Sequence, residues 1–311
     1  PKIEGGTFVQ AESEVAAINM VYGSASTGVR CMTSSSSPGI ALKQEGIAYC
    51  CGAELPCVIG SVSRGGPGLG SIQPAQSDYF QATRGGGNGD YRVIVYAPYN
   101  LQELSDLTQK AFYMADKYRN PVMLLLDGTI AQMMEGVEIR DITFPPIDKS
   151  NWAITGKKGR KEHHIITSIY LDTDTCEKHN HKLFKKYDEI EKNEAEVELY
   201  LTDDAEIIIA SYGTSARIVK NAINDLRKKG IKAGLIRPIT LWPFPYAAFK
   251  NISEPCKAVM SIELSMGQMI QDVKIGVAGK YEIGFYGRCG GNLFDSEEVV
   301  NAIEKYYKEV K

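Results

Sequence analysis

Apolar strands that alternate with helical stretches are the feature that most constrains the fold of this chain. In the first half, four apolar runs are continuous instead of alternating with polar residues, which is typical of parallel strands buried on both faces. These runs cover residues 29–33, 56–62, 92–97 and 121–127. Helical patterns over residues 38–53 and 101–118 lie between them. The alternation predicts a doubly wound parallel sheet with helices on both faces.

The second half repeats the alternation on a smaller scale. Strands are predicted at 206–212, 232–239, 258–263 and 282–286, and helices at 214–229, at 266–278 and from 296 onward. Between the halves, the pattern breaks around residues 144–161, and a charged helical stretch follows at 177–201. We therefore expect an α/β fold with two doubly wound parallel-sheet domains, over residues 1–145 and 205–311, and a connector over 146–204.

Length and charge narrow the classes of function. A chain of 311 residues is long enough for two domains that each bury a core. The net charge of −3 gives no basic footprint, so we expect neither nucleic acid nor an anionic membrane as a partner. No apolar run reaches the length of about 20 residues that spans a bilayer, and no secretory segment is visible. These features predict a cytoplasmic protein.

The cysteines and histidines predict no metal site in this chain. Seven cysteines form no C-x-x-C pair, and most lie in or beside apolar stretches, where cysteine behaves as a small buried residue. We therefore expect no iron-sulfur cluster on this chain. The pair His179 and His181 lacks acidic or thiolate partners at a spacing typical of metal ligands.

Glu14 is the first candidate site residue. It lies where an apolar run over residues 7–11, predicted as a strand, passes into a helix that carries Ala16, Ala17 and Gly23. In open parallel sheets, ligands bind in the crevice at the carboxyl ends of the strands, and small residues permit close approach. An acidic residue in the first helical turn is also favoured by the helix dipole alone, and this structural role stays open.

Arg64 is the second candidate. It ends the apolar strand predicted before it, so we expect its guanidinium to lie in the same crevice as Glu14, where it could bind a substrate carboxylate in a bidentate pair. The alternative is a surface arginine paired with a neighbouring acid. The presence of Glu14 and Arg64 at two strand ends of one predicted sheet favours a site.

Three loops after predicted strands are rich in glycine and polar residues, at residues 33–39, 64–74 and 84–90. Each could present backbone N–H groups to an anion. None of them is a P-loop or a G-x-G-x-x-G motif at the start of a helix, so nucleotide binding is only weakly indicated. Glycine that merely turns the chain explains these loops equally well.

Four ordered strings in the first half point to a known family. They are F-V-Q-A-E-S-E-V-A-A-I-N-M, S-S-S-S-P-G-I-A-L-K-Q-E-G-I, R-G-G-P-G-L-G-S-I-Q-P-A-Q-S-D-Y and G-N-G-D-Y-R. Together they resemble the alpha subunit of 2-oxoacid:ferredoxin oxidoreductases, which use thiamine diphosphate. The string L-I-R-P-I-T-L-W-P-F-P in the second half is similar to the transketolase carboxyl-terminal-like domain of that family. The resemblance implies that the first domain binds the pyrimidine of the cofactor.

The resemblance also implies roles for both candidate residues. A glutamate at the place of Glu14 bonds N1′ of the aminopyrimidine in thiamine enzymes and acts as the acid/base partner of the cofactor. Arg64 matches the substrate-binding arginine of the family and would hold the carboxylate of the 2-oxoacid. The implied reaction is the oxidative decarboxylation of a 2-oxoacid to an acyl-CoA and CO2, with ferredoxin as the electron acceptor and coenzyme A as co-substrate.

Further components of the implied enzyme have no counterpart in this sequence. In the superfamily a G-D-G motif with a downstream asparagine holds the diphosphate and its magnesium, and the chain contains no G-D-G. We therefore expect the diphosphate and Mg on a beta subunit, and the iron-sulfur clusters on gamma and ferredoxin-like subunits of the same complex. Because the chain opens at Pro1, an amino-terminal segment of the family is expected to be missing.

The choice of substrate rests on the branch of the family. The strings P-G-L-G-S-I-Q-P and S-S-S-S-P-G-I resemble the branch that acts on 2-oxoisovalerate (3-methyl-2-oxobutanoate) more than the 2-oxoglutarate branch. Three alternatives remain: a 2-oxoglutarate:ferredoxin oxidoreductase subunit, a dehydrogenase subunit that passes its acyl group to lipoamide, and a non-catalytic scaffold subunit. The retention of both Glu14 and Arg64 argues against the scaffold.

Overall fold

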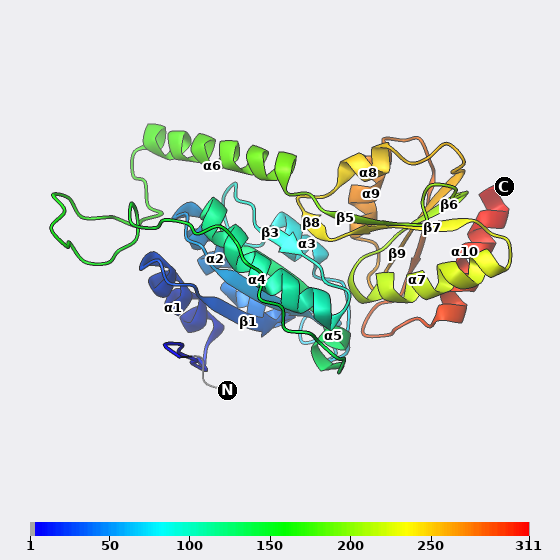
Figure 1. Cartoon of the computed structure of the whole chain (residues 1–311), viewed down its shortest axis with the longest axis horizontal. Helices are drawn as coiled ribbons and strands as arrows, with labels where there is room; N and C mark the ends of the chain where they lie inside the picture. The colour runs from blue at the N-terminus through cyan, green and yellow to red at the C-terminus, as the bar shows by residue number, and fades with distance from the viewer. Residues whose placement is uncertain (1–3, 311) are drawn as a thin grey trace.

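Two five-stranded sheets with flanking helices form the two lobes of the chain (Figure 1). A computed structural model describes residues 4–310. The first sheet has the order β1 (Met32–Ser36), β2 (Val58–Ser63), β4 (Val122–Asp127), β3 (Ile94–Tyr96) and β8 (Thr240–Trp242). The second has the order β10 (Ile283–Gly287), β9 (Ala258–Glu263), β6 (Ile207–Ala210), β7 (Ala233–Pro238) and β5 (Val197–Tyr200). The predicted α/β class is confirmed.

Each sheet is parallel except for one edge strand. In the first sheet β8 runs antiparallel to β3, and in the second β5 runs antiparallel to β7. The prediction of purely parallel sheets is therefore wrong at these two edges. Strand β8 comes from beyond the predicted boundary at residue 204, and β5 comes from the predicted connector. Because β8 pairs with β3, it ties the second half of the chain to the first sheet.

Ten helices are found in the part of the chain that the structure describes, and most follow the predicted pattern. Those of the first lobe are α1 (Glu14–Ser26), α2 (Ser37–Gly52), α3 (Tyr79–Arg84), α4 (Leu101–Tyr118) and α5 (Gly128–Gln132). The others are α6 (Thr173–Asn193), α7 (Gly213–Lys228), α8 (Tyr246–Lys250), α9 (Met269–Val277) and α10 (Ser296–Val310). Helices α2 and α4 begin and end within one residue of their predicted bounds.

The strand predicted over residues 7–11 is absent. These residues have no regular structure, and Phe8 is 93% exposed. A strand needs a neighbour that exchanges backbone hydrogen bonds, and the first sheet ends at β1, which pairs with β2. Apolar content alone therefore misled the prediction, although Glu14 does begin a helix, as predicted.

Two further elements differ from their predicted positions. The strand expected at 29–33 lies further along the chain, as β1. Its serines pair with β2, so backbone pairing and not hydrophobicity determines where β1 begins and ends. The helix expected over 177–201 begins earlier, at Thr173, and ends at Asn193, after which β5 forms. Because charged residues continue past the end of α6, the sequence pattern did not reveal that the helix ends and the edge strand β5 begins.

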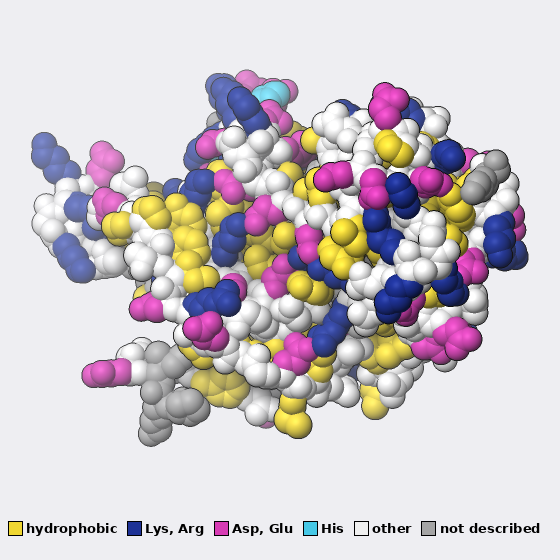
Figure 2. All heavy atoms as spheres, turned by 45° about the vertical axis from the view of Figure 1, so that its right-hand side comes forward, with side chains coloured by type: hydrophobic (Ala, Val, Ile, Leu, Met, Phe, Trp, Pro, Cys, Tyr) yellow, Lys and Arg dark blue, Asp and Glu magenta, His cyan; other side chains and the backbone are white. Residues whose placement is uncertain are grey.

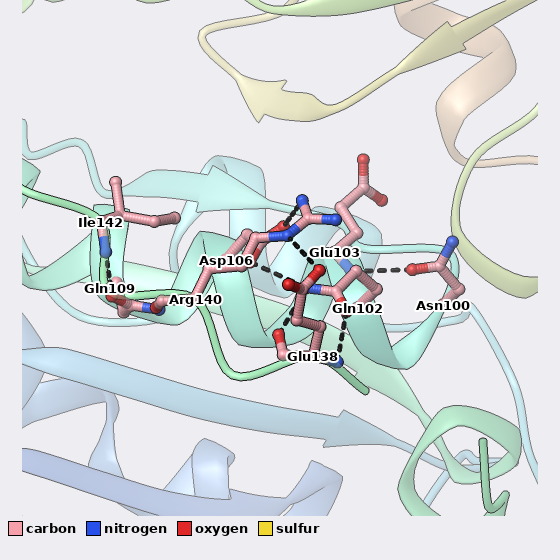
Figure 3. A network of polar contacts seen from close by, with 8 residues as sticks. All are labelled: Asn100, Gln102, Glu103, Asp106, Gln109, Glu138, Arg140 and Ile142. Carbon is pink, nitrogen blue, oxygen red and sulfur yellow. Dashed lines mark hydrogen bonds and ion pairs between the residues drawn. The ribbon is translucent and has the colours of Figure 1, made fainter. Parts of the chain in front are cut away.

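The segment that follows α5 runs along α4 before it loops out of the first lobe (Figure 1). Figure 3 shows the polar contacts that hold this segment. Gln102 Nε2 donates to the carbonyl of Glu138 at 3.0 Å, and Arg140 pairs with Asp106 at 3.1 Å. Because the Arg140 side chain is half-exposed, this pair contributes little to stability.

A buried arginine joins the two lobes. Arg237 of β7 forms a bidentate pair with Glu103 of α4, at 3.0 and 2.8 Å, and its Nε donates to Glu198 of β5 at 2.5 Å. Only 3% of the Arg237 side chain is exposed. Its charge is therefore satisfied by one carboxylate from each lobe, and loss of the arginine would leave both carboxylates unbalanced at partly buried positions.

Neither the charge distribution on the face drawn in Figure 2 nor the helices of the described residues indicate a membrane-spanning or single-sign surface. Figure 2 shows lysine, arginine and acidic side chains mixed over the face that it draws, with no large patch of one sign. Among the described residues, no helix has both the length and the apolar character that crossing a membrane requires.

We expect Arg237→Met to lower the free energy of unfolding by about 3 kcal/mol, because it strands the Glu103 and Glu198 carboxylates. Arg140→Met removes the exposed pairs of Figure 3 and should cost less than about 1 kcal/mol. Denaturant unfolding of the full chain measures both. Equal losses for the two variants would contradict the role given to Arg237.

Candidate functional site

Glu14 lies against the end of β1, where α1 begins. The Ser35 hydroxyl donates to its Oε1 at 3.4 Å, and the Glu14 side chain is half-buried. On its other side, the Glu14 carboxylate packs against Gly39 of α2, so closely that no space remains for a Cβ at Gly39. A Cβ at Gly39 would lie 2.7 Å from Glu14 Oε1 and 2.0 Å from Ser35 Oγ. Glycine is therefore needed here for the carboxylate to lie at the sheet edge.

A second glycine of α2 extends the same contact. A Cβ at Gly46 would lie 2.5 Å from Ile18 Cγ2, and Ile18 follows Glu14 by one helical turn. The two glycines are seven residues apart, so they lie on one face of α2. Helix α1 thus packs unusually close to α2, and this approach determines where Glu14 lies.

Arg64 follows β2 at the same edge of the sheet. Its backbone N–H donates to the Ser37 hydroxyl at 2.9 Å, which ties it to the first residue of α2. The Arg64 side chain is half-buried, and its Nε is fully buried without a hydrogen-bond partner. An unsatisfied buried donor costs free energy, so this guanidinium is suited to an acceptor that the chain itself does not supply.

The structure thus brings the two predicted residues to one place. Strands β1 and β2 are neighbours and parallel, so their carboxyl ends meet at one edge. Ser35 contacts Glu14 and Ser37 contacts Arg64, and only one residue separates these serines. The site is open in the single chain, since neither side chain is fully buried.

Asp78 is a further charged group at this edge that the sequence did not single out. Its carboxylate and the Ser37 hydroxyl form a short hydrogen bond. Burial raises the pKa of the Asp78 carboxyl group above its usual value, and the hydrogen bond from Ser37 and the charge of Arg64 oppose this shift. Asp78 thus balances part of the Arg64 charge without pairing with it directly.

The glycine loop after Arg64 is fixed by the second lobe. A Cβ at Gly65 would lie 2.6 Å from the carbonyl carbon of Gly290, and Ser71 Oγ donates to the Gly290 carbonyl at 3.0 Å. Gly291 has a φ of +100°, and a Cβ there would lie 2.4 Å from Gln73 Cβ. Gly65 thus packs on the backbone of Gly290, and Gly291 packs on the side chain of Gln73, which leaves no space for a side chain at Gly65 or Gly291.

Gln76 anchors the far end of this loop. Its Nε2 donates to the carbonyl of Tyr212 at 2.8 Å, while its Oε1 accepts from Ser215 Oγ at 2.7 Å and from the backbone N–H of Leu264 at 2.9 Å. Gln76 is 3% exposed, so these bonds form away from water. The loop that begins at Arg64 is therefore held at both ends by the second lobe.

The other two glycine-rich segments do not form open anion-binding loops. All of residues 33–39 belong to β1 and α2. In residues 84–90, the backbone N–H groups of Gly86 and Gly87 donate to the Tyr91 hydroxyl, at 3.1 and 2.9 Å. In residues 4–310, no group of three or more His, Cys, Asp or Glu side chains is arranged to hold a metal ion.

The sequence missed the residues that support Glu14 and Arg64. Lys43 on α2 is 1% exposed and lies near Glu14, yet in the sequence it is one lysine among many charged residues. Ser37 and Gly290 contact the Arg64 loop from distant positions. A lysine at the centre of an otherwise small and apolar helical face was the one local signal available for Lys43.

Comparisons with known proteins agree with this architecture. The family described as pyruvate flavodoxin/ferredoxin oxidoreductase, thiamine diP-binding, matches residues 1–199, and pyruvate:ferredoxin oxidoreductase core domain II matches residues 205–299. The ketoisovalerate oxidoreductase subunit VorB of Methanothermobacter marburgensis is 46% identical over 301 residues, which cover 97% of this chain and 85% of that protein. The 2-oxoglutarate synthase subunit KorA of Methanothermobacter thermautotrophicus is 34% identical over 329 residues, covering 97% and 87%.

Two solved structures are also similar. The 2-oxoglutarate:ferredoxin oxidoreductase from Magnetococcus marinus, with 2-oxoglutarate, coenzyme A and succinyl-CoA bound, superposes with a TM-score of 0.86 at 28% identity. The match covers 97% of this chain, which spans 57% of that longer chain. A split-gene transketolase, at 16% identity and a TM-score of 0.61, covers 98% of this chain and 84% of its own, and shares the fold alone.

We expect Gly291→Ala to detach the loop of the second lobe from the Arg64 loop, because the new methyl group has no space beside Gln73. Gly279→Ala is the matched control, since its φ is +78° but nothing lies within 4 Å of a Cβ there. Both variants carry left-handed strain of about 1–2 kcal/mol. Only Gly291→Ala should speed tryptic cleavage after Arg64, and equal cleavage in both variants would contradict the packing role.

Proposed function

We propose that this chain, which belongs to the pyruvate flavodoxin/ferredoxin oxidoreductase family, is the alpha-type catalytic subunit of a ketoisovalerate:ferredoxin oxidoreductase. The premise is that the chain is a subunit of a 2-oxoacid:ferredoxin oxidoreductase. The proposed reaction is the oxidative decarboxylation of 3-methyl-2-oxobutanoate to an acyl-CoA and CO2. The observation that carries the proposal is the meeting of Glu14 and Arg64 at one open edge of the first sheet.

The residues at this edge fit the pyrimidine half of thiamine diphosphate. Glu14 has one weak contact, to Ser35 at 3.4 Å, so its carboxylate can accept a hydrogen bond from a ligand. Gly39 keeps the space beside the carboxylate free of a side chain. Bound thiamine diphosphate would supply a carbon nucleophile and an electron sink for the decarboxylation of the 2-oxoacid. In this proposal Glu14 holds or gives up a proton at N1′ of the pyrimidine.

Arg64 is proposed to bind the carboxylate of the 2-oxoacid. Support comes from its buried Nε, which has no partner, and from the absence of any carboxylate within ion-pair distance of Arg64 among residues 4–310. A planar guanidinium binds a carboxylate through two parallel hydrogen bonds and so fixes its orientation. The fixed loop beyond Arg64 reduces the freedom of this side chain, which favours a single substrate pose.

Other subunits are proposed to complete the site. The relatives are named as subunits, which implies a complex of several chains. The chain lacks G-D-G, so we infer that a beta subunit binds the diphosphate and Mg, and that gamma and ferredoxin-like subunits carry the iron-sulfur clusters. Exposed apolar side chains near Glu14 support a partner at this face: Val15 is 45% and Met20 52% exposed. We further infer that coenzyme A is the co-substrate, that ferredoxin accepts the electrons, and that the complex lies in the cytoplasm.

A 2-oxoglutarate substrate is the second candidate. It is favoured by the similarity to KorA proteins and to the structure with 2-oxoglutarate bound, both of which share less identity with this chain than the VorB proteins do. The two substrates differ in the second carboxylate of 2-oxoglutarate. A pocket for it would need a further cation, whereas the branched acid needs an apolar pocket.

We expect Glu14→Gln to reduce turnover by at least about 10²-fold, because glutamine cannot exchange a proton with N1′. The measurement is reduction of a viologen or ferredoxin by the co-expressed complex, with thiamine diphosphate, coenzyme A and 3-methyl-2-oxobutanoate. Glu12→Gln, two residues away and exposed, is the matched control and should leave turnover unchanged. Full turnover in Glu14→Gln with an assembled complex would favour a scaffold role.

We expect the complex to turn over 3-methyl-2-oxobutanoate faster than 2-oxoglutarate, and Arg64→Lys to raise KM for either acid by about 10-fold or more, since lysine cannot form the bidentate pair. Steady-state kinetics with both acids measures this. Faster turnover of 2-oxoglutarate would overturn the substrate and keep the chemistry. An unchanged KM in Arg64→Lys would remove Arg64 from the substrate site.

A further inference from the structure

Asp78 is a carboxylate whose position is not explained by the helix that it precedes. It lies directly before α3, where aspartate commonly caps a helix, yet its side chain makes no capping hydrogen bond there. Its Oδ2 instead accepts a hydrogen bond from the hydroxyl of Ser37, the first residue of α2. The carboxylate therefore joins the start of α3 to the start of α2.

The segment around Asp78 is held by the second lobe. Gln268, which directly precedes α9, donates from Nε2 to the carbonyl of Ser77 at 2.7 Å. The Tyr79 hydroxyl donates to Asp272 of α9 at 2.6 Å, and both of these side chains are buried. Because the residues on both sides of Asp78 are bound to the second lobe, that lobe determines where the Asp78 carboxylate lies.

Ser37 transmits this position to Arg64. A serine hydroxyl has one hydrogen to donate and two lone pairs that accept, whereas an ionised carboxylate only accepts. Because Ser37 donates its hydrogen to Asp78, its oxygen is left as an acceptor, and the Arg64 backbone N–H donates to it at 2.9 Å. The carboxylate thus orients the hydroxyl, and the hydroxyl holds the Arg64 backbone.

The backbone contacts of Arg64 determine where its guanidinium can lie. On one side the N–H is bound by Ser37, and on the other the Gly65 N–H donates to the carbonyl of Gln73 at 3.0 Å, which closes the loop. The side chain has a buried Nε without a hydrogen-bond partner. Among residues 4–310, no acidic side chain forms an ion pair with Arg64 that could hold the guanidinium instead.

We propose that Ser37 and Asp78 are positioning residues for Arg64, which hold its backbone so that the guanidinium meets the carboxylate of the 2-oxoacid in a bidentate pair. This inference rests on the substrate-binding role proposed above for Arg64. A bidentate pair needs both the distance and the plane of the two groups to match, so a small displacement of the Arg64 backbone weakens it. Neither positioning residue touches the substrate, and both act through Arg64.

Joining α2 to α3 is the competing, purely structural role of the two residues. Loss of a structural contact would lower the amount of assembled enzyme, and with it the apparent kcat, but would leave KM unchanged. Loss of a positioning contact raises KM, and does so only while residue 64 is arginine. The two roles therefore predict different kinetic results.

The test uses the assembled complex with thiamine diphosphate, Mg, coenzyme A and the 2-oxoacid that it turns over faster. We expect Ser37→Ala to raise KM about 3- to 10-fold, the factor that loss of one hydrogen bond produces, and to change kcat by less than about twofold. Ser37→Thr keeps the hydroxyl and should retain nearly the wild-type KM. Ser77→Ala is the matched control, because Ser77 binds Gln268 through its carbonyl, and should leave KM unchanged. An unchanged KM in Ser37→Ala would overturn the inference.

A double-mutant cycle separates this inference from the proposed function. If Ser37 acts through the guanidinium, Ser37→Ala should raise the KM of Arg64→Lys by less than about twofold. Additive increases in KM would overturn the positioning role, since Ser37 would then act independently of Arg64. An unchanged KM in Arg64→Lys alone would refute the function proposed for Arg64, whereas a raised KM there, with no effect of Ser37→Ala, would refute only the present inference.

A chemical measurement gives a result that does not depend on turnover. Phenylglyoxal modifies accessible guanidinium groups, and peptide mass spectrometry measures its rate at Arg64. We expect this rate to rise about 3-fold or more in Ser37→Ala, because loss of the hydrogen bond frees the Arg64 backbone. If Ser37→Ala does not assemble, Asp78→Asn replaces it, since its amide can also donate and no longer orients the Ser37 hydroxyl. Wild-type KM and wild-type modification in Asp78→Asn would overturn the inference.

Discussion

The close approach of α1 and α2 is the constraint on which the candidate site depends. Two glycines on one face of α2, Gly39 and Gly46, accept Glu14 and Ile18 from successive turns of α1. Any side chain at either glycine would separate the helices and remove Glu14 from the end of β1. Between these glycines lies Lys43, so one helical face provides both the space for the carboxylate and the cation behind it.

The second lobe acts on the site from a distance. It contributes neither Glu14 nor Arg64, but it holds the loop after Arg64 through Gly290 and through the partners of Gln76. Strand β8, which the second half of the chain adds to the first sheet, and the buried Arg237 restrict movement of one lobe against the other. The geometry of Arg64 therefore depends on an interface, and a change at this interface would alter substrate binding without touching the substrate.

Periodicity predicted the fold where strands are buried and central, and failed where they are at an edge. Strands β2 and β4 are apolar because neighbours cover both faces, so hydrophobicity located them. Strand β1 is rich in serine, and β5 follows a charged helix, so pairing with β2 and β7 defines them instead. The same applies to the site: Glu14 and Arg64 follow from their places at element ends, whereas Asp78 and Gly290 reach the site through contacts that no local pattern encodes.

The site of the single chain is incomplete in a consistent way. Arg64 has a buried donor without an acceptor, Glu14 has one weak hydrogen bond, and apolar side chains of α1 are exposed nearby. A site that functioned in the isolated chain would satisfy these groups internally, because unsatisfied donors and exposed apolar surface both cost free energy. Lys43, in contrast, is buried and already hydrogen-bonded. The chain therefore carries a preformed charged support behind an open face, which is the arrangement expected of one half of a site that a partner subunit completes.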